Sequence, residues 1–558
     1  MTTQPKIFRG VPLSVAFMTL GLFALSTMPT PLQALSSGAW TNASAGSWST
    51  PTNWMGNALV SGISQAAGFI GQPSAGGTIS STIPIAIGSI DVDIPNQTLT
   101  IDFGTNTLSF NSASGAYISA GSDLHVNTHV ILQSSINIDP QSNTTITFGV
   151  SSIPPHAGGI GEMAPPQSVT ITGVPGDSTS RVVYAAQNTY TGQTTVNGRL
   201  NSTAADTIRG NLLVNPLGVF DCSAISGVFH TPSNTIADVK GNLINGMGLT
   251  QTLGQLHVID NGSVSAGNFT LTDPTSPLTM GGGTIAVDLM TLQMGGTITY
   301  DPTLSDTLST IQGPSLSTIN IDLSGNTVDL NVPPHLASFA GDVSLAFINA
   351  NFQNGALTKS GSGTVALTTA NASPTTITDF TVNAGTVLIP NSGDVVITLP
   401  MTTFTISTGG ALTGIGTLIG VMGGPTNVVN NGVVEPGQSL FGDIGTLTIS
   451  GNYTQSNMGS LFIKGLNTGS HDKLLVSGSG TVILDGALVF DAQPGSSFSP
   501  GDQIVVLDNP GGNIMGAFSS FTSTAPPNVT ASLVPTPTQI IIKFVASGVC
   551  PPCPVCPQ

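Results

Sequence analysis

Residues 188–198 read Asn-Thr-Tyr-Thr-Gly-Gln-Thr-Thr-Val-Asn-Gly. A second stretch of related character begins with Leu357, Lys359, Gly361, Gly363 and Thr364 and ends in Val382-Asn383-Ala384-Gly385-Thr386-Val387-Leu388. Weak internal repeats of this kind are typical of chains that stack one supersecondary unit on the next. We therefore expect a solenoid rather than a row of independent domains.

The sequence around these repeats alternates apolar and polar residues, as in Leu99, Ile101 and Phe103, or in Val169 and Ile171. A period of two with one apolar face predicts short, half-buried strands. Many short strands would form either several sandwiches or one solenoid, and the scarcity of linkers favours the solenoid. The predicted class is all-β, with stacked parallel strands over most of residues 60–545 and very little helix.

The composition agrees with strands and excludes several functions. Charged residues make up 7% and aromatic residues 5% of the 558 residues, and the mean hydropathy is +0.29. A disordered chain would be more charged and less apolar. The net charge of −17 argues against nucleic acid and anionic lipid as partners, because both attract Lys and Arg.

The N-terminus predicts export. Lys6 and Arg9 precede an apolar run from Val11 to about Met28, and Leu32-Gln33-Ala34 is typical of a signal-peptidase site. An uncleaved anchor helix is the alternative, since a run of roughly 18 residues nearly spans a bilayer. Nearby prolines and the polar chain that follows favour cleavage, and no later stretch is apolar and long enough to span a membrane as a helix.

Both repeat stretches resemble the β-strand repeat of autotransporter passenger domains, which reads approximately Leu-x-Lys-x-Gly-x-Gly-Thr-Leu, Asn-Thr-Tyr-Thr-Gly-x-Thr-x-Val and Ala-Gly-Thr-Leu. The first stretch lacks the Lys-x-Gly leader, and the second has Asn371-Ala372-Ser373-Pro374 in place of Asn-Thr-Tyr-Thr. Residues 430–545, which include Asn431-Gly432-Val433-Val434-Glu435-Pro436-Gly437, resemble the C-terminal folding segment of the same passengers.

This resemblance implies a right-handed parallel β-helix that is secreted or held at the cell surface or outer membrane of a Gram-negative-type bacterium. Autotransporters continue into a membrane barrel of at least about 8 strands of roughly 10 residues. Here about a dozen residues follow the last predicted strand, Ile540–Phe544. We therefore expect export by another system, or through a barrel on another chain.

The expected organisation has six parts. Residues 1–34 are a signal peptide, 35–151 an N-terminal cap with the first coils, and 152–180 a Pro- and Gly-rich loop or a joint between two stacks. Residues 181–429 form a β-helix with degenerate repeats, 430–545 an autochaperone-like segment, and 546–558 a Cys- and Pro-rich tail. Trp40, Trp48 and Trp54 either cap the first coil or stack on sugars; the cap is favoured because an open edge strand must be covered.

The tail carries Cys550, Cys553 and Cys556, separated by prolines. In polyproline II, at 3 residues per turn and about 3.1 Å rise, these cysteines share one face with α-carbons roughly 9 Å apart, beyond the ~7 Å limit for a disulfide. We expect them to pair with an envelope protein or with a second copy, as the similar Cys-Pro-Pro-Cys-Pro string of antibody hinges does. A metal site and a tail without a role are the alternatives. Cys222 is expected to be a small buried residue.

Few residues indicate other chemistry. His125 and His129 are four apart, but on a strand they would share a face as structural residues rather than hold a metal. Neither a Gly-x-Ser-x-Gly elbow nor a phosphate-binding loop occurs. Basic residues are scattered, and only Arg199 and Arg209 are placed to sit on adjacent coils. No catalytic, cofactor-binding or metal-binding residue is predicted.

Two functions fit this sequence. The first is a non-catalytic, exported structural or adhesin-like protein that contacts host cells or neighbouring cells, without nucleic acid as a partner. The alternative is a β-helix polysaccharide lyase or hydrolase. A wall that places two or more carboxylates near a base would favour the enzyme, whereas a smooth surface of Ser, Thr and Asn would favour the first function.

Overall fold

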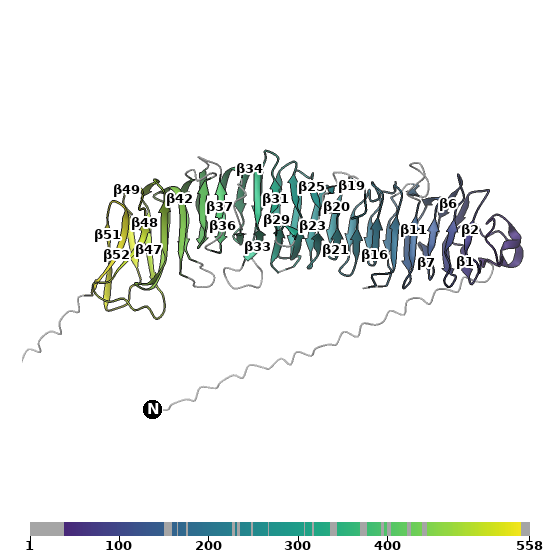
Figure 1. Ribbon diagram of the computed structural model, residues 1–558, viewed down its shortest axis with the longest axis horizontal. Helices are drawn as coiled ribbons and strands as arrows, with labels where there is room; N and C mark the ends of the chain where they lie inside the picture. Colours follow the sequence, from purple (N-terminus) through teal and green to yellow (C-terminus); the bar gives the residue numbers. More distant parts are fainter. Residues whose placement is uncertain are drawn as a thin grey trace, which may run out of the picture.

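The computed structural model describes residues 38–547 apart from 150–158, 164–165, 175–176, 226–228, 231–234, 247–248, 266, 306, 315–316, 335–342, 369–375, 392–394, 399–402, 421–425 and 438–443. These residues form one long rod whose strands run across its axis (Figure 1). Their helical structure is confined to 3-10 turns, such as η2 (Pro51–Asn53) and η3 (Met55–Asn57), and the larger of their two sheets has 48 strands. The predicted parallel β-helix is confirmed.

Each coil contributes a strand to each of up to three walls, and strands of successive coils pair in parallel. The first wall runs from β1 (Ala66–Ile70) to β49 (Asn513–Gly516), and the second from β2 (Gly77–Ile79) to β50 (Ser520–Ser523). The third wall starts at β3 (Ile85–Ile87) and ends at β48 (Gln503–Asp508). In the later coils one strand bends across a corner and serves two walls. These long strands are β34 (Ala350–Ser360), β36 (Thr376–Ile389), β38 (Thr403–Gly414) and β42 (Thr446–Gln455).

The coils differ in length. Equivalent side chains of neighbouring coils are 18 residues apart at Asn197 and Asn215, and 33 residues apart at Asp491 and Thr524, and both pairs are hydrogen-bonded. The corners between strands absorb most of this difference, and the ladders keep their register except for shifts in the pairings of β33, β34 and β36.

The core is a set of stacks along the rod axis. Inward residues of the first wall lie directly over one another in successive coils, in the order Ile118, Ile138, Ile171, Val196, Val214, Val239 and Val258. All seven side chains are fully buried. Burying one such side chain is worth roughly 1.5–3 kcal/mol, and only a neighbouring coil can bury it. This explains why an alternating sequence of modest hydropathy folds by stacking.

The three tryptophans seal the N-terminal end. Trp48 Nε1 donates to the carbonyl of Val60 at 2.8 Å, and Trp54 Nε1 donates to the carbonyl of Trp48 at 2.8 Å. The Trp40 and Trp54 ring centroids are 5.0 Å apart in an edge-to-face arrangement. All three side chains are at most 2% exposed, so they form the predicted cap. The alternative of sugar stacking is wrong because their ring faces do not reach the surface.

The C-terminal end closes differently. β51 (Val529–Pro535) and β52 (Gln539–Ala546) form an antiparallel hairpin, and β52 also pairs antiparallel with β48. The rings of Phe498 and Phe544 stack beneath it at 4.1 Å. The hairpin therefore extends the third wall alone.

Two sequence interpretations need correction. Within 152–180, β13 (Val169–Ile171) pairs in parallel with both β10 (Ile136–Pro140) and β15 (Thr194–Val196), so the first wall runs through this range and no joint divides the rod. His125 and His129 do not share a face, because β8 (Leu124–Val126) and β9 (His129–Leu132) lie on the second and third walls.

The predicted signal peptide, residues 1–34, and Cys550, Cys553 and Cys556 lie outside the described residues. Within the described part, no helix has the length and apolar character to cross a membrane.

Candidate functional site

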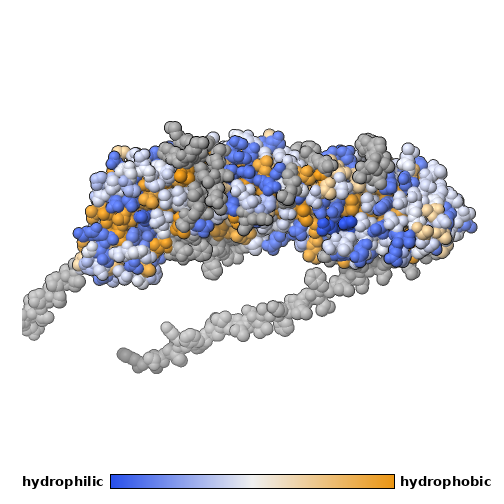
Figure 2. Space-filling model, viewed as in Figure 1, coloured by the Kyte–Doolittle hydropathy of each residue, from blue (hydrophilic) through white to orange (hydrophobic). Residues whose placement is uncertain are grey.

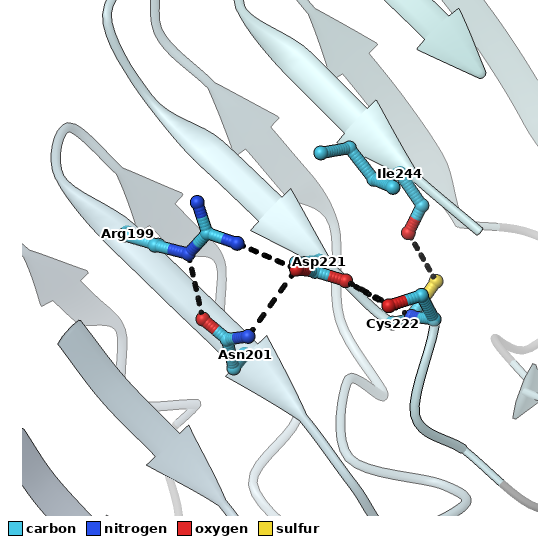
Figure 3. Close-up of polar contacts among 6 residues, drawn as sticks. Arg199, Asn201, Asp221, Cys222 and Ile244 are labelled. Carbon is cyan, nitrogen blue, oxygen red and sulfur yellow. Dashed lines mark hydrogen bonds and ion pairs between the residues drawn. The ribbon is translucent and has the colours of Figure 1, made fainter. Parts of the chain in front are cut away.

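Arg199, the basic residue singled out by the sequence, lies on the outer face of the second wall in β16 (Arg199–Ser202). Its Nη2 donates to Asp221 Oδ2 at 2.7 Å, and its Nε donates to Asn201 Oδ1 at 3.0 Å. Asp221 ends β18 (Val219–Asp221), the next strand of this wall. Figure 3 shows the three side chains turned toward one another across the two strands.

The Asp221 carboxylate is fully engaged. Oδ2 also accepts from Asn201 Nδ2 at 3.3 Å, and Oδ1 accepts from the Ser223 hydroxyl at 2.6 Å and the Ser223 N–H at 3.1 Å. An acid–base catalyst needs a carboxylate or base free to reach the substrate proton. The polar atoms of this network are hydrogen-bonded to one another, which is typical of residues that hold two coils together.

Cys222 follows Asp221 and points inward. Its sulfur donates to the carbonyl of Ile244 at 3.2 Å (Figure 3), and the residue is 1% exposed. Burial raises the pKa of the Cys222 thiol to about 12, with a further contribution from the Asp221 charge. The thiol therefore stays protonated near neutral pH and unreactive, as the sequence predicts for a small buried residue.

Arg209 does not stack on Arg199, contrary to the expectation from sequence. It lies between β16 and β17 (Leu212–Val214), so the chain reaches Arg209 before the next pass of the first wall begins. The side-chain Nε of Arg209 is buried without a hydrogen-bond partner. The two arginines thus belong to one coil and do not form a basic pair.

A group of charges that the sequence interpretation missed lies on the first wall. Asp238 in β20 (Ile236–Val239) is in register with His257 in β23 (Gln255–Ile259), and their Oδ1 and Nδ1 atoms are 2.8 Å apart. Beyond these strands, Lys240 Nζ and Asp260 Oδ2 are 3.1 Å apart. Two carboxylates and two bases thus meet on neighbouring coils, although they are already paired. Asp238 and His257 are neighbours because the coil between them is 19 residues long. The length of an individual coil could not be predicted from the sequence pattern.

Lys359, the lysine of the repeat leader, is buried inside the rod with 0% exposure. Its Nζ donates to the carbonyls of Ser360 at 2.7 Å, Gly361 at 2.7 Å and Ala384 at 3.0 Å. Gly385 has a φ of 71°, and a side chain there would meet this ammonium group. Burial lowers the pKa of Lys359 to about 8, against the raising effect of Asp329. The Lys and Gly of the repeat therefore build a corner between two walls.

A second buried charge group lies in the 430–545 segment. Lys464 Nζ is 2.8 Å from Glu435 Oε1 and 3.6 Å from Asp472 Oδ2. The Asp472 carboxylate also accepts the backbone N–H groups of Gly445 and Lys464, both at 2.9 Å. Burial raises the pKa of Asp472 to about 7. The contacts hold the β43 (Ser460–Asn467) to β44 (Ser470–His471) hairpin against its coil.

Among the described residues, no group of three or more His, Cys, Asp or Glu side chains is arranged to hold a metal ion. His125 and His129 are half-buried on separate walls.

Comparison with known proteins adds a likeness to solved structures. No family model matches the sequence, and no curated protein matches it. The crystal structure of the Haemophilus influenzae Hap adhesin aligns with 86% of this chain and 64% of its own chain, at 12% sequence identity and a TM-score of 0.26. The chain thus spans less than two thirds of the adhesin. At this TM-score the likeness carries no conclusion about function.

If the Arg199 network is a brace, Arg199→Met will lower the free energy of unfolding by about 1 kcal/mol, because it leaves the 11%-exposed Asp221 carboxylate without its cation. Denaturant unfolding measures this change. Lys240→Met is the matched control, since its ion pair is 33% and 41% exposed and such pairs contribute about 0–1 kcal/mol. Equal stability of Arg199→Met and wild type would contradict the brace.

Proposed function

We propose that this protein is an exported, non-catalytic β-solenoid that serves as a structural or adhesin-like surface, secreted from or held at the surface of a Gram-negative-type cell. The observation that carries the proposal is the outer surface of the walls, where amide side chains of successive coils form ladders. Asn111 Nδ2 donates to Gln133 Oε1 at 2.6 Å, and Asn452 Nδ2 donates to Asn427 Oδ1 at 2.7 Å.

Such ladders repeat at the spacing of neighbouring strands, about 4.8 Å. A row of hydrogen-bonding groups with this repeat suits an extended partner, such as a polymer or another cell surface, better than a small substrate. In Figure 2 the visible wall mixes pale and hydrophilic residues with small apolar patches along its length. We infer recognition spread over many weak polar contacts.

The scarcity of exposed rings supports the same proposal. Among the described aromatic residues whose burial is known, those not buried are Tyr117, Phe462, Phe518 and Phe521. Sugar-cleaving sites commonly stack sugar rings on exposed aromatic faces, and the side walls offer few of them. The Arg199 network, moreover, has no free acid or base.

The experiment that tests export and surface exposure is protease treatment of intact cells. We expect the protein to be degraded in intact cells, and to be retained inside them when residues 1–34 are deleted. A cytoplasmic protease-resistant protein of the same abundance serves as the lysis control. Protection of the full-length protein until the cells are lysed would refute the surface proposal.

The alternative function, a polysaccharide lyase or hydrolase, would have to use the Asp238, Lys240, His257 and Asp260 group, which places two carboxylates beside two bases. The test is incubation with acidic polysaccharides, followed by measurement of unsaturated products and new reducing ends. We expect no product, because each base is paired with a carboxylate. Product formation that is lost in His257→Ala or Lys240→Ala, but kept in Arg199→Met, would establish the enzyme instead.

A further inference from the structure

The two ends of the rod differ in how their edge strands are covered. At the N-terminal end all three walls are covered by the chain itself. The N–H of Trp40 donates to the carbonyl of Gly68 on the first wall, Trp48 to Ser80 beside the second, and Gly62 to Ala86 on the third. Together with the buried tryptophans, these bonds cover each wall at that end of the described chain.

The C-terminal end is only partly closed. The hairpin of β51 and β52 extends the third wall, and its turn touches the first wall through one bond, from the N–H of Ile514 to the carbonyl of Pro537 at 2.9 Å. On the second wall, β50 pairs with β47 (Ala487–Ala492) and, among the described residues, with no other strand. The second wall therefore ends in an edge.

The backbone of β50 points hydrogen-bonding groups out of this edge. The N–H groups of Ser520 and Thr524 donate inward, to the carbonyls of Gly486 and Phe490. Because alternate residues of a strand point to opposite neighbours, the N–H groups of Phe521 and Ser523 face away from the rod. Edge strands are normally protected by charged residues or proline, and Ser520-Phe521-Thr522-Ser523 contains neither.

The end face around this edge is apolar. Six residues pack on the core but stay partly exposed: Ile514, Phe518, Phe521, Ala525, Ala531 and Leu533. Inward residues elsewhere along the rod are almost all fully buried. The last coil therefore lacks the cover that every earlier coil receives from the next one.

The distribution of charge along the chain indicates that the partner of this end face is a second copy. The whole chain has a net charge of −17, so its side walls repel those of another copy. Between Pro510 and Ser547, which form this end, Lys543 is the sole charged residue. The end face is thus the place where two copies meet with little repulsion.

We propose that the C-terminal end face binds the same face of a second copy, with β50 antiparallel to its counterpart about a two-fold axis. Two identical edges related by a two-fold axis pair antiparallel, and such an interface closes at the dimer. The tryptophan cap opposes head-to-tail stacking, because it covers the edges of the first described coil. The result is a rod of double length with a sealed cap at each tip.

The three tail cysteines follow this end face in the sequence, so a disulfide between copies would lock the dimer. Ser547, whose hydroxyl donates to the carbonyl of Pro527 at 2.7 Å, fixes the end of β52 at this face, and Cys550 follows three residues later in the sequence. Two dimerised chains would thus begin their tails near each other. One cysteine thiol from each copy forms the disulfide by exchange with an oxidised dithiol carrier, which accepts the two electrons and two protons and leaves as the dithiol.

The decisive experiment uses the full chain with Cys550, Cys553 and Cys556 all changed to Ser, so that only the noncovalent interface is measured. Sedimentation equilibrium is expected to show a monomer–dimer equilibrium. Ser523→Pro removes an outward N–H, and Thr522→Lys places like charges across the interface at an exposed residue of β50. Each should weaken dimerisation by at least about tenfold. Met294→Lys, at a side-wall residue 55% exposed, is the matched control and should have no effect.

A monomer at every concentration up to about 100 μM would overturn the proposal. A dimer unaffected by both Ser523→Pro and Thr522→Lys would overturn it as well. Thr522→Lys keeps the test decisive if Ser523→Pro perturbs folding, because it changes only an exposed side chain. With the cysteines restored, non-reducing electrophoresis of thiol-blocked protein is expected to show a dimer that collapses on reduction. Adducts to a different protein without any homodimer would refute the disulfide arrangement.

Discussion

Trp48→Ala is expected to lower the free energy of unfolding of the N-terminal coils by about 3–5 kcal/mol, the range for large buried aromatic side chains. The substitution removes a fully buried ring and its hydrogen bond to Val60, and leaves the Trp54 ring without one of its neighbours. A solenoid's stability is a sum of local terms. The loss should therefore appear as faster amide exchange in β1, β4 (Ser89–Asp93) and β5 (Leu99–Ile101), with β42 unchanged.

Two controls separate capping from ordinary packing. Phe404→Ala removes a fully buried ring from the middle of the rod and should accelerate exchange around β38, not at the end. Trp48→Phe should restore most of the stability, because a ring still covers the first coil. Uniform acceleration of exchange along the whole rod in Trp48→Ala would contradict a local cap.

Lys359→Met is expected to lower the free energy of unfolding by about 2 kcal/mol, the second large effect. The substitution leaves three buried carbonyls without a donor. The carbonyls belong to Ser360, Gly361 and Ala384. Methionine has a similar length and shape, so lost packing contributes little. Chemical denaturation measures the change, and Lys240→Met is the control because its amine is at the surface. A Lys359→Met protein as stable as wild type would show that water satisfies these carbonyls.

The same lysine predicts a pH dependence. Its pKa falls from 10.5 to about 8 on folding, so between these values the unfolded chain binds more protons than the folded one. Stability from this group is therefore constant below pH 8 and rises as the pH increases toward 10. The difference in unfolding free energy between wild type and Lys359→Met isolates it, because the buried tyrosines contribute equally to both. A difference independent of pH from 7 to 10 would contradict the lowered pKa.

The fold could be predicted from the sequence because the core residues of a solenoid follow local sequence patterns. Period-two alternation marks the inward residues, as in Leu99 and Ile101, and the repeats show that successive units are equivalent. The tryptophans were interpretable because a stack of open coils requires a cover. These inferences need no knowledge of which residues become neighbours between coils.

The candidate sites could not be predicted in this way, because they depend on which residues of successive coils become neighbours. Equivalent positions are 20 residues apart where Arg199 reaches diagonally to Asp221. They are 19 residues apart where Asp238 lies beside His257. Since coil length varies, sequence spacing alone does not identify contacts on the outer walls, and the expected Arg199 and Arg209 pairing was wrong for this reason. The burial of Lys359 could not be predicted either, because lysine normally indicates a surface position.

The unequal coils bear on how such a protein diversifies. Closing a longer loop costs little, only about 0.6 kcal/mol for each doubling of its length, and the ladder between Asp491 and Thr524 shows that a 33-residue turn keeps the same alignment as an 18-residue one. Peptides can thus enter or leave at the corners without disturbing the stacked interior. The corners of the rod can therefore change in length and sequence during evolution while its core stays constant.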